Sequence, residues 1–301
     1  MAAEPSENGD ILKRATYASV VVALLLIAVK FGAYLVTGSV SLLSTLLDSL
    51  LDAAASLVNL VAVRHALTPP DREHRFGHGK AEPLAALGQS AFVAGSALLL
   101  LFEVGSRLVN PQPVTNTGIG IGVMVFAIVV TIGLVSYQRS VIRRTGSLAI
   151  RADSLHYFGD LLVNGAVIVA LLLASELGWI YVDPIFGAVI AAYILYNAWQ
   201  IARGAFDMLM DRELSDADRQ RIKDIVLAHP EVRQIHDLRT RASGPVSFIQ
   251  FHLELDGDMS LARAHGIADA VEAEICSRFP GAEVIIHQDP AGLQEERPRY
   301  A

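Results

Sequence analysis

Two distant parts of the chain carry ionisable side chains at helical spacing within otherwise apolar sequence. Asp48 and Asp52 lie four residues apart, as do His156 and Asp160, so each pair would occupy one face of a helix. A charged side chain at the depth of a membrane core costs about 2.5–3.5 kcal/mol on insertion scales. Three carboxylates and one imidazole suit a divalent transition metal. Tetrahedral oxygen and nitrogen ligation favours Zn²⁺ and leaves Fe²⁺, Co²⁺, Cd²⁺ and Mn²⁺ open.

The alternative for these acids is a purely structural role. A single buried Asp could pair with a basic residue or cap a break in a helix, and Lys30 is an available partner. Two such pairs on separate helices favour a shared metal instead. Asp153 lies on the same face as His156 but nearer the start of its helix, and we expect it to be a vestibule acid or a helix-start acid rather than a ligand.

Two further groups could bind metal. The first is a short polar segment in which Asp71, His74 and His78 could converge, although histidines in loops are often only solvated. The second comprises residues that fall on predicted strands or helices near the C-terminus: His236, His252, His265, His287 and Asp289. Scattered surface histidines are the alternative there. His65 and His229 fall outside these groups, and we interpret both as structural.

Composition places the chain in a membrane. Of its 301 residues 52% are hydrophobic and only 18% are charged, against about 25% in soluble domains, and the mean hydropathy is +0.42. The net charge of -7 gives no indication of a nucleic-acid partner. The single cysteine, Cys276, excludes an internal disulfide and a multi-thiolate metal cluster.

Apolar stretches long enough to cross a membrane predict six helices. They lie near residues 15–37, 40–64, 82–107, 118–138, 150–174 and 180–205. Lys and Arg are concentrated before the first stretch and after the second, fourth and sixth. This asymmetry predicts that both termini are cytoplasmic.

The remaining sequence predicts a small α+β domain in the order αββαβ. Helical periodicity over Ser215–His229 precedes alternating strands at Val232–Arg241 and Val246–Leu255. A second helix and a short strand follow at Leu261–Phe279 and Val284–His287. We expect a cytoplasmic segment at 1–14, a membrane domain at 15–208, a cytoplasmic domain at 209–290 and a disordered tail at 291–301.

Missing motifs narrow the function. The chain contains neither a G-x-x-x-x-G-K-[ST] phosphate loop nor an H-E-x-x-H protease motif, so ATP-driven transport and zincin chemistry are not indicated. No nucleophile–base pair accompanies the ligands, and an enzyme is not expected. Transport driven by an ion gradient is the simplest interpretation. A passive metal channel and a membrane-anchored metal sensor or scaffold remain alternatives.

Several sequence motifs carry a family resemblance. They include the runs Gly38-Ser-Val-Ser-Leu-Leu, Phe76-Gly-His-Gly-Lys-Ala-Glu, Arg151-Ala-Asp-Ser-Leu-His-Tyr and Val284-Ile-Ile-His-Gln-Asp-Pro. With Asp48-Ser-Leu-Leu-Asp52, these runs resemble the cation diffusion facilitators, and the likeness extends from about residue 15 to 290.

The resemblance implies a homodimer of six-helix protomers in the plasma (inner) membrane, each with a metallochaperone-like cytoplasmic domain. It implies export of Zn²⁺ or a similar ion in exchange for protons. The intramembrane group would be the transport site, the loop group a second site, and the C-terminal group a binuclear site at the dimer interface. Lys80 and Asp211 match positions of a charge interlock near the membrane surface, and Leu155 matches a hydrophobic gate.

Overall fold

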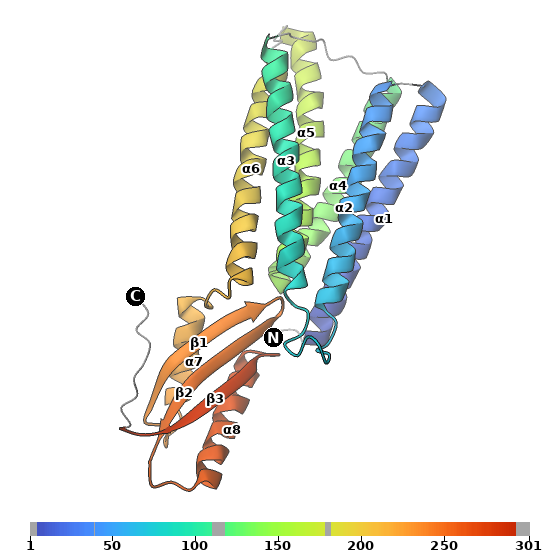
Figure 1. The fold of residues 1–301 in the computed structure, drawn as a ribbon. Coiled ribbons are helices and arrows are strands. Elements are labelled where there is room, and N and C mark those ends of the chain that lie inside the picture. The colour runs from blue at the N-terminus through green and yellow to red at the C-terminus, as the bar shows by residue number, and fades with distance from the viewer. Residues whose placement is uncertain (1–4, 39, 110–117, 178–181, 293–301) are drawn as a thin grey trace. The chain divides into compact units, whose positions relative to one another are not determined.

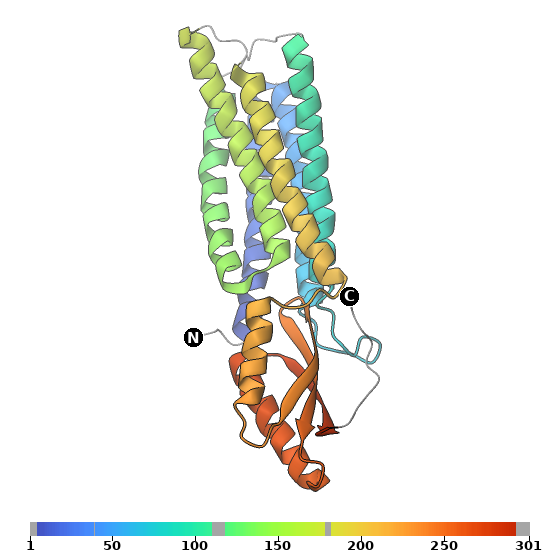
Figure 2. The ribbon, with the colours of Figure 1, turned by 90° about the vertical axis from the view of Figure 1, so that its left-hand side faces the viewer.

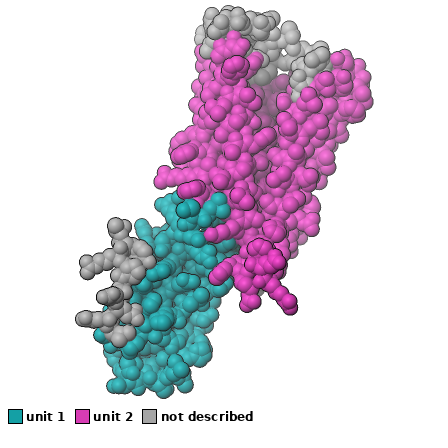
Figure 3. Space-filling view, in the orientation of Figure 1, with its two compact units in different colours: residues 1–5, 207–301 teal, residues 6–206 magenta. Residues whose placement is uncertain are grey.

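The structure, a computed structural model, describes residues 5–38, 40–109, 118–177 and 182–292. It divides into two compact units (Figure 3). One contains residues 6–206, and the other contains residues 207–301 with 1–5. The expected disordered tail falls almost wholly outside the described residues.

The first unit is helical (Figure 1). Its helices are α1 (Pro5–Thr37), α2 (Val40–Ala66), α3 (Ala81–Val109), α4 (Gly118–Thr145), α5 (Leu148–Leu177) and α6 (Val182–Leu209). Five of them, α1 to α4 and α6, meet the length and hydropathy needed for a membrane span within the described residues. The chain therefore has a membrane-helical domain with five candidate spans. The expected span at 150–174 falls on α5, and a count of six spans stays a prediction.

Helix boundaries follow local sequence signals. Gly38 after α1 and Gly146 after α4 both adopt positive φ, 61° and 67°, and donate their N–H groups back to Tyr34 and Ile142. This left-handed conformation suits glycine and ends each helix within one residue. At the other end, α1 begins at Pro5, well before the span expected from residue 15, and proline is compatible with that first helical turn.

Small side chains let the helices of this unit pack closely. Helix α5 packs against α3 and α4, and α2 packs against α3. Ala86, Ala152 and Ala205 are completely buried in the cluster that joins α3, α5 and α6. Small residues allow helix backbones to approach one another closely. Close packing matters in a membrane because the hydrophobic effect does not drive helices together in lipid. Figure 2 shows the helices side by side along the unit.

The second unit has the predicted αββαβ order. Its elements are α7 (Asp216–Leu227), β1 (Gln234–Ser243), β2 (Val246–Leu255), α8 (Leu261–Arg278) and β3 (Glu283–Pro290). Strand β2 is central, antiparallel to β1 and parallel to β3. Helices α7 and α8 cover one face of the sheet (Figure 2). The sheet's other face carries several ionisable side chains beside apolar ones such as Phe248.

Alternation along β2 separates the core from that polar face. Ile249, Phe251 and Leu253 are buried against the two helices. Because side chains alternate along a strand, His252 and Glu254 point to the opposite face. The sheet thus positions ionisable groups on a rigid surface.

Candidate functional site

Helices α2 and α5 bring three of the four expected intramembrane ligands together. The Nε2 atom of His156 lies 2.9 Å from Asp52 Oδ1 and 3.9 Å from Asp160 Oδ2. One ligand atom from each residue falls within 4.8 Å of the others. His156 and Asp160 share a face of α5 through their i,i+4 spacing, and α2 presents Asp52 to them. The arrangement can hold a divalent cation.

Asp48 lies one turn from Asp52 and lines the same cavity, although it is not within the three-residue cluster. The cavity has a volume of about 390 Å³ and is lined by residues of α2, α3, α5 and α6. Leu155, the expected gate residue, is buried in the apolar cluster that joins α3, α5 and α6. Lys30 donates from Nζ to Ser49 Oγ at 2.6 Å and to the Thr45 carbonyl at 3.1 Å.

Asp153 occupies a different environment from the one expected. Its side chain is completely buried, so the vestibule alternative is wrong, whereas its place near the start of α5 agrees with the other alternative. Its carboxyl accepts hydrogen bonds from Ser19 Oγ at 2.6 Å, Gln138 Nε2 at 2.7 Å and Ser56 Oγ at 3.4 Å. Tyr157 Oη lies 2.9 Å from Ser56 Oγ. These contacts tie α5 to α1, α2 and α4, and nothing in the spacing of these residues signals them.

The loop between α2 and α3 gathers the second expected group. Asp71 Oδ1 lies 3.3 Å from His74 Nδ1, and Asp71 Oδ2 lies 3.3 Å from His78 Nε2. The backbone N–H groups of His74 and Glu73 donate to Asp71 Oδ1 and hold the pKa of that carboxyl below its usual range. These hydrogen bonds favour the ionised form of the carboxyl, which is the form that binds metal. A third imidazole is close by, since the His65 and His78 ring centroids are 4.5 Å apart.

The C-terminal sheet aligns three of the expected histidines. His236 pairs with His252 across β1 and β2, and His252 pairs with His287 across β2 and β3. Asp289 is buried at their centre. Its Oδ2 lies 2.7 Å from His252 Nδ1 and 3.3 Å from His236 Nε2, and its Oδ1 lies 3.1 Å from His287 Nε2. One carboxylate thus faces three imidazoles.

The donor set at this sheet fits a transition metal. Both ring nitrogens of His236 are buried, and among the described residues neither makes a hydrogen bond of acceptable geometry. Buried polar groups without a hydrogen bond are uncommon, and a cation shared by His236 Nε2 and the Asp289 carboxylate 3.3 Å away would satisfy that nitrogen. Glu254 was not expected in this group, yet its Oε1 lies 2.9 Å from His236 Nδ1. Glu254 lies two residues after His252, so the alternation of side chains along a strand could have indicated that both lie on the same face.

Other expected members are not brought into these clusters. His265 on α8 is exposed, and its Nε2 lies 3.4 Å from Asp269 Oδ2, an i,i+4 neighbour. Asp211 pairs with Arg241, with 3.3 Å between Oδ1 and Nη1. Lys80 and Asp211 belong to different units, so their interlock stays a prediction.

Comparison with known proteins agrees with these features. Residues 16–210 match the family model described as the cation efflux transmembrane domain, and residues 214–291 match the cation efflux protein, cytoplasmic domain. Relatives named "Cation-efflux pump FieF" from Salmonella choleraesuis and Salmonella typhimurium are 51% identical over 285 residues, 95% of this chain and 95% of each relative.

A solved structure titled "Mode of Action of a Putative Zinc Transporter CzrB" is 34% identical over 26% of this chain and 99% of that chain. Its TM-score of 0.26 does not establish a common fold for the whole chain. The family models and the relatives span nearly all of the sequence, and they confirm the resemblance drawn from its motifs. The chain belongs to the cation efflux family and is a membrane transporter with a C-terminal cytoplasmic domain.

Proposed function

We propose that this protein exports Zn²⁺ from the cytoplasm in exchange for protons, by alternating access to the intramembrane group. Fe²⁺, Cd²⁺ and Co²⁺ are compatible with the same ligands. The observation that carries the proposal is the cluster of Asp52, His156 and Asp160 in a cavity between helices of the membrane domain. Asp48 on the same cavity supplies the fourth ligand once helix α2 or the side chain adjusts.

Proton coupling follows from the ligand chemistry. Carboxylates and imidazole bind metal only in their deprotonated forms, so metal binding releases protons and protonation releases metal. Exposure of the site to the two sides of the membrane in turn would convert this competition into exchange. Leu155 would close the path on one side, and Lys80 with Asp211 would restrain the units near the membrane surface.

The other clusters have supporting roles in this proposal. Two protomers would form a homodimer that spans the plasma membrane. The N- and C-termini of each protomer would lie in the cytoplasm. The C-terminal group would hold structural or regulatory metal at the dimer interface, with His265 and His287 completing a binuclear site. The loop group would bind metal on the cytoplasmic side. Removing His252 should weaken association if these metals only join the protomers, and should shift the activating metal concentration if they act as a sensor.

The test is Zn²⁺ flux into proteoliposomes across an imposed pH gradient. Wild type is compared with Asp52→Asn, which keeps the side-chain shape but removes the charge, and with Asp10→Asn as a matched change at an exposed acid on α1. The expected result is gradient-dependent zinc movement with opposite proton movement, abolished by Asp52→Asn and retained by Asp10→Asn.

Other results would favour the alternatives. Zinc flux indifferent to the pH gradient, without proton movement, would indicate a passive channel. Tight binding without flux of Zn²⁺, Cd²⁺ or Fe²⁺ would indicate a membrane-anchored sensor. Retention of coupled flux by Asp52→Asn would move the transport site away from the α2–α5 cluster.

A further inference from the structure

We propose that His65, at the end of α2, is a fourth protein ligand of the loop site formed by Asp71, His74 and His78. This inference rests on the proposed loop site. A tetrahedral Zn²⁺ site takes four ligands, and three protein side chains leave one position for water or another donor. His65 comes from the helix rather than from the loop, so its binding would change what the site does.

Ring spacing supports a shared ion. The His65 and His78 centroids are 4.5 Å apart, and the His74 and His78 centroids are 4.6 Å apart. His74 and His78 belong to a group whose ligand atoms lie within 4.8 Å of one another. His65 therefore approaches His78 as closely as a residue already in that group. In the C-terminal group with the same closeness of ligand atoms, the His236 and His252 centroids are 5.0 Å apart.

The surroundings of His65 and His78 differ, and this difference indicates how freely each side chain can move. The His78 side chain is only 4% exposed, and its Nδ1 lies 3.3 Å from the Thr68 carbonyl oxygen, which leaves Nε2 for a metal. His65 lies in the last turn of α2 and is exposed. An exposed side chain changes rotamer at little cost. His78 is thus the fixed member, and His65 can turn onto the ion or away from it.

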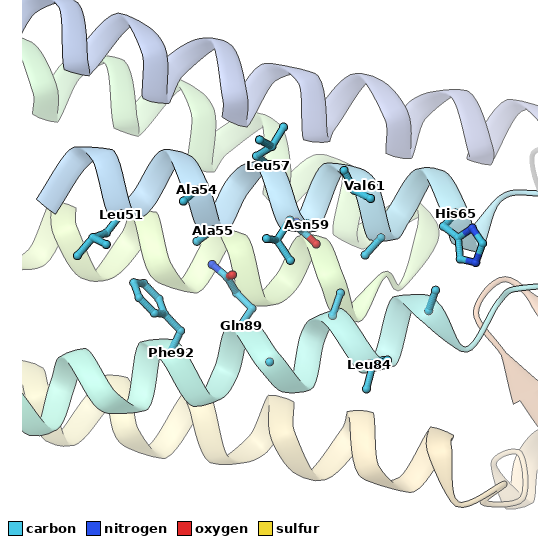
Figure 4. A pocket seen from close by; sticks show the side chains of 15 residues that line it. Leu51, Ala54, Ala55, Leu57, Asn59, Val61, His65, Leu84, Gln89 and Phe92 are labelled. Atoms are coloured by element: carbon cyan, nitrogen blue, oxygen red, sulfur yellow. The ribbon is translucent and has the colours of Figure 1, made fainter. Parts of the chain in front are cut away.

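The position of His65 links the loop site to a second feature. A cleft of about 870 Å³ lies between α2 and α3, with His65 at one end and Leu51 and Phe92 at the other (Figure 4). Leu51 and Phe92 also line the cavity of the intramembrane group. Between these ends, Asn59 Oδ1 and Gln89 Nε2 are buried and have no hydrogen-bond partner among the described residues.

Two states of the loop site follow. With His65 bound, four protein ligands close the coordination shell and fasten the loop to α2. With His65 turned away, one coordination position opens beside the mouth of the cleft. His65 therefore controls how tightly the loop holds its metal and where that metal can leave.

The test measures Zn²⁺ affinity of the loop site in the full-length protein. Asp52→Asn and Asp289→Asn weaken the other two sites, and a fluorescent chelator competes for the metal. In this background His65→Ala, His65→Phe and His65→Cys are compared, with His229→Ala as the control histidine. Phenylalanine keeps a ring against His78 but offers no ligand, whereas cysteine restores a zinc ligand.

We expect His65→Ala and His65→Phe to weaken loop-site binding by at least about 10-fold, by comparison with the effect of losing even outer-shell partners. His65→Cys should recover most of that loss, and His229→Ala should change nothing. The visible absorption of Co²⁺ bound at the loop should change in His65→Phe, because water or another donor then replaces an imidazole ligand.

Two results would overturn the inference in distinguishable ways. If His65→Phe binds zinc as tightly as the background while His78→Ala abolishes binding, the loop site stands with three protein ligands and His65 only packs against it. If neither Asp71→Ala nor His78→Ala affects binding, the proposed loop site itself fails.

Discussion

Replacing Asp153 by alanine tests whether the buried hydrogen-bond cluster holds the helices of the membrane domain together. The carboxyl accepts two short hydrogen bonds, from Ser19 at 2.6 Å and Gln138 at 2.7 Å, and a longer one from Ser56 at 3.4 Å. Hydrogen bonds between membrane helices average about 0.6 kcal/mol and reach about 1.7 kcal/mol. The two short bonds therefore contribute at most about 3 kcal/mol.

Part of this loss is recovered within the cluster. Ser19 Oγ also lies 3.2 Å from the Ala15 carbonyl oxygen, Gln138 Nε2 lies 3.0 Å from Ser19 Oγ, and Ser56 keeps its contact with Tyr157. We expect a net destabilisation of about 2 kcal/mol, since the donors are re-paired but the small cavity remains. For a unit of this size that corresponds to a decrease of roughly 4–8 °C in Tm.

The assay is thermal unfolding of the full-length protein in detergent, followed by helical circular dichroism. Asp10→Ala is the matched control because its side chain is 68% exposed, and its effect should stay within about 0.5 kcal/mol. Asp153→Asn keeps one acceptor oxygen and should fall between wild type and Asp153→Ala. If Asp153→Ala unfolds at the temperature of Asp10→Ala, the cluster does not stabilise the helix packing.

Three further changes have definite expected outcomes. Asp289→Asn should weaken zinc binding at the C-terminal cluster by at least about 10-fold in equilibrium dialysis, since its carboxylate faces three imidazoles; unchanged binding would exclude it as a ligand. Gly187→Ala should destabilise the helical unit by about 1–3 kcal/mol in thermal unfolding, because the new Cβ would lie 2.7 Å from a methyl group of Val104 on α3. Gly204→Ala should not destabilise it, because its Cβ would lie 3.6 Å from the nearest atom, a methyl group of Leu148. Equal effects of the two changes would contradict this packing. An Asp carboxyl is ionised at pH 5 even at its ordinary pKa of about 3.9, and the pKa of Asp71 is lowered further. Asp71→Asn should therefore weaken loop-site zinc binding by the same factor at pH 7 and at pH 5. A factor that disappears at pH 5 would mean that the carboxyl is already protonated there.

Local sequence patterns were sufficient for much of the architecture. Hydropathy placed the helices of the membrane domain, because length and apolar composition are properties of each segment alone. Alternation and helical periodicity gave the αββαβ order, because each element's pattern repeats within its own residues. The four-residue spacing of His156 and Asp160 placed both on one face of α5 for the same reason.

Partners distant in the chain could not be obtained in this way. Asp153 is within reach of Ser19 and Gln138 only because α1 and α4 pack against the same part of α5. His65 meets His78 only because the chain returns from the loop beside the end of α2. Neither neighbour is marked by periodicity, so the sequence left a vestibule open for Asp153 and did not signal the contact between His65 and His78.

The strands of the C-terminal sheet show most clearly what the sequence determines and what only the tertiary structure determines. The sequence by itself determined that His287 and Asp289 share one face of a strand, since side chains alternate with a period of two. It did not determine that His236, His252 and His287 lie in one row across three strands. That row depends on which residues of neighbouring strands pair, and a shift by a single residue would turn a strand's ligands to the core. The register is set by packing of the opposite face against α7 and α8, and only the tertiary structure supplies it.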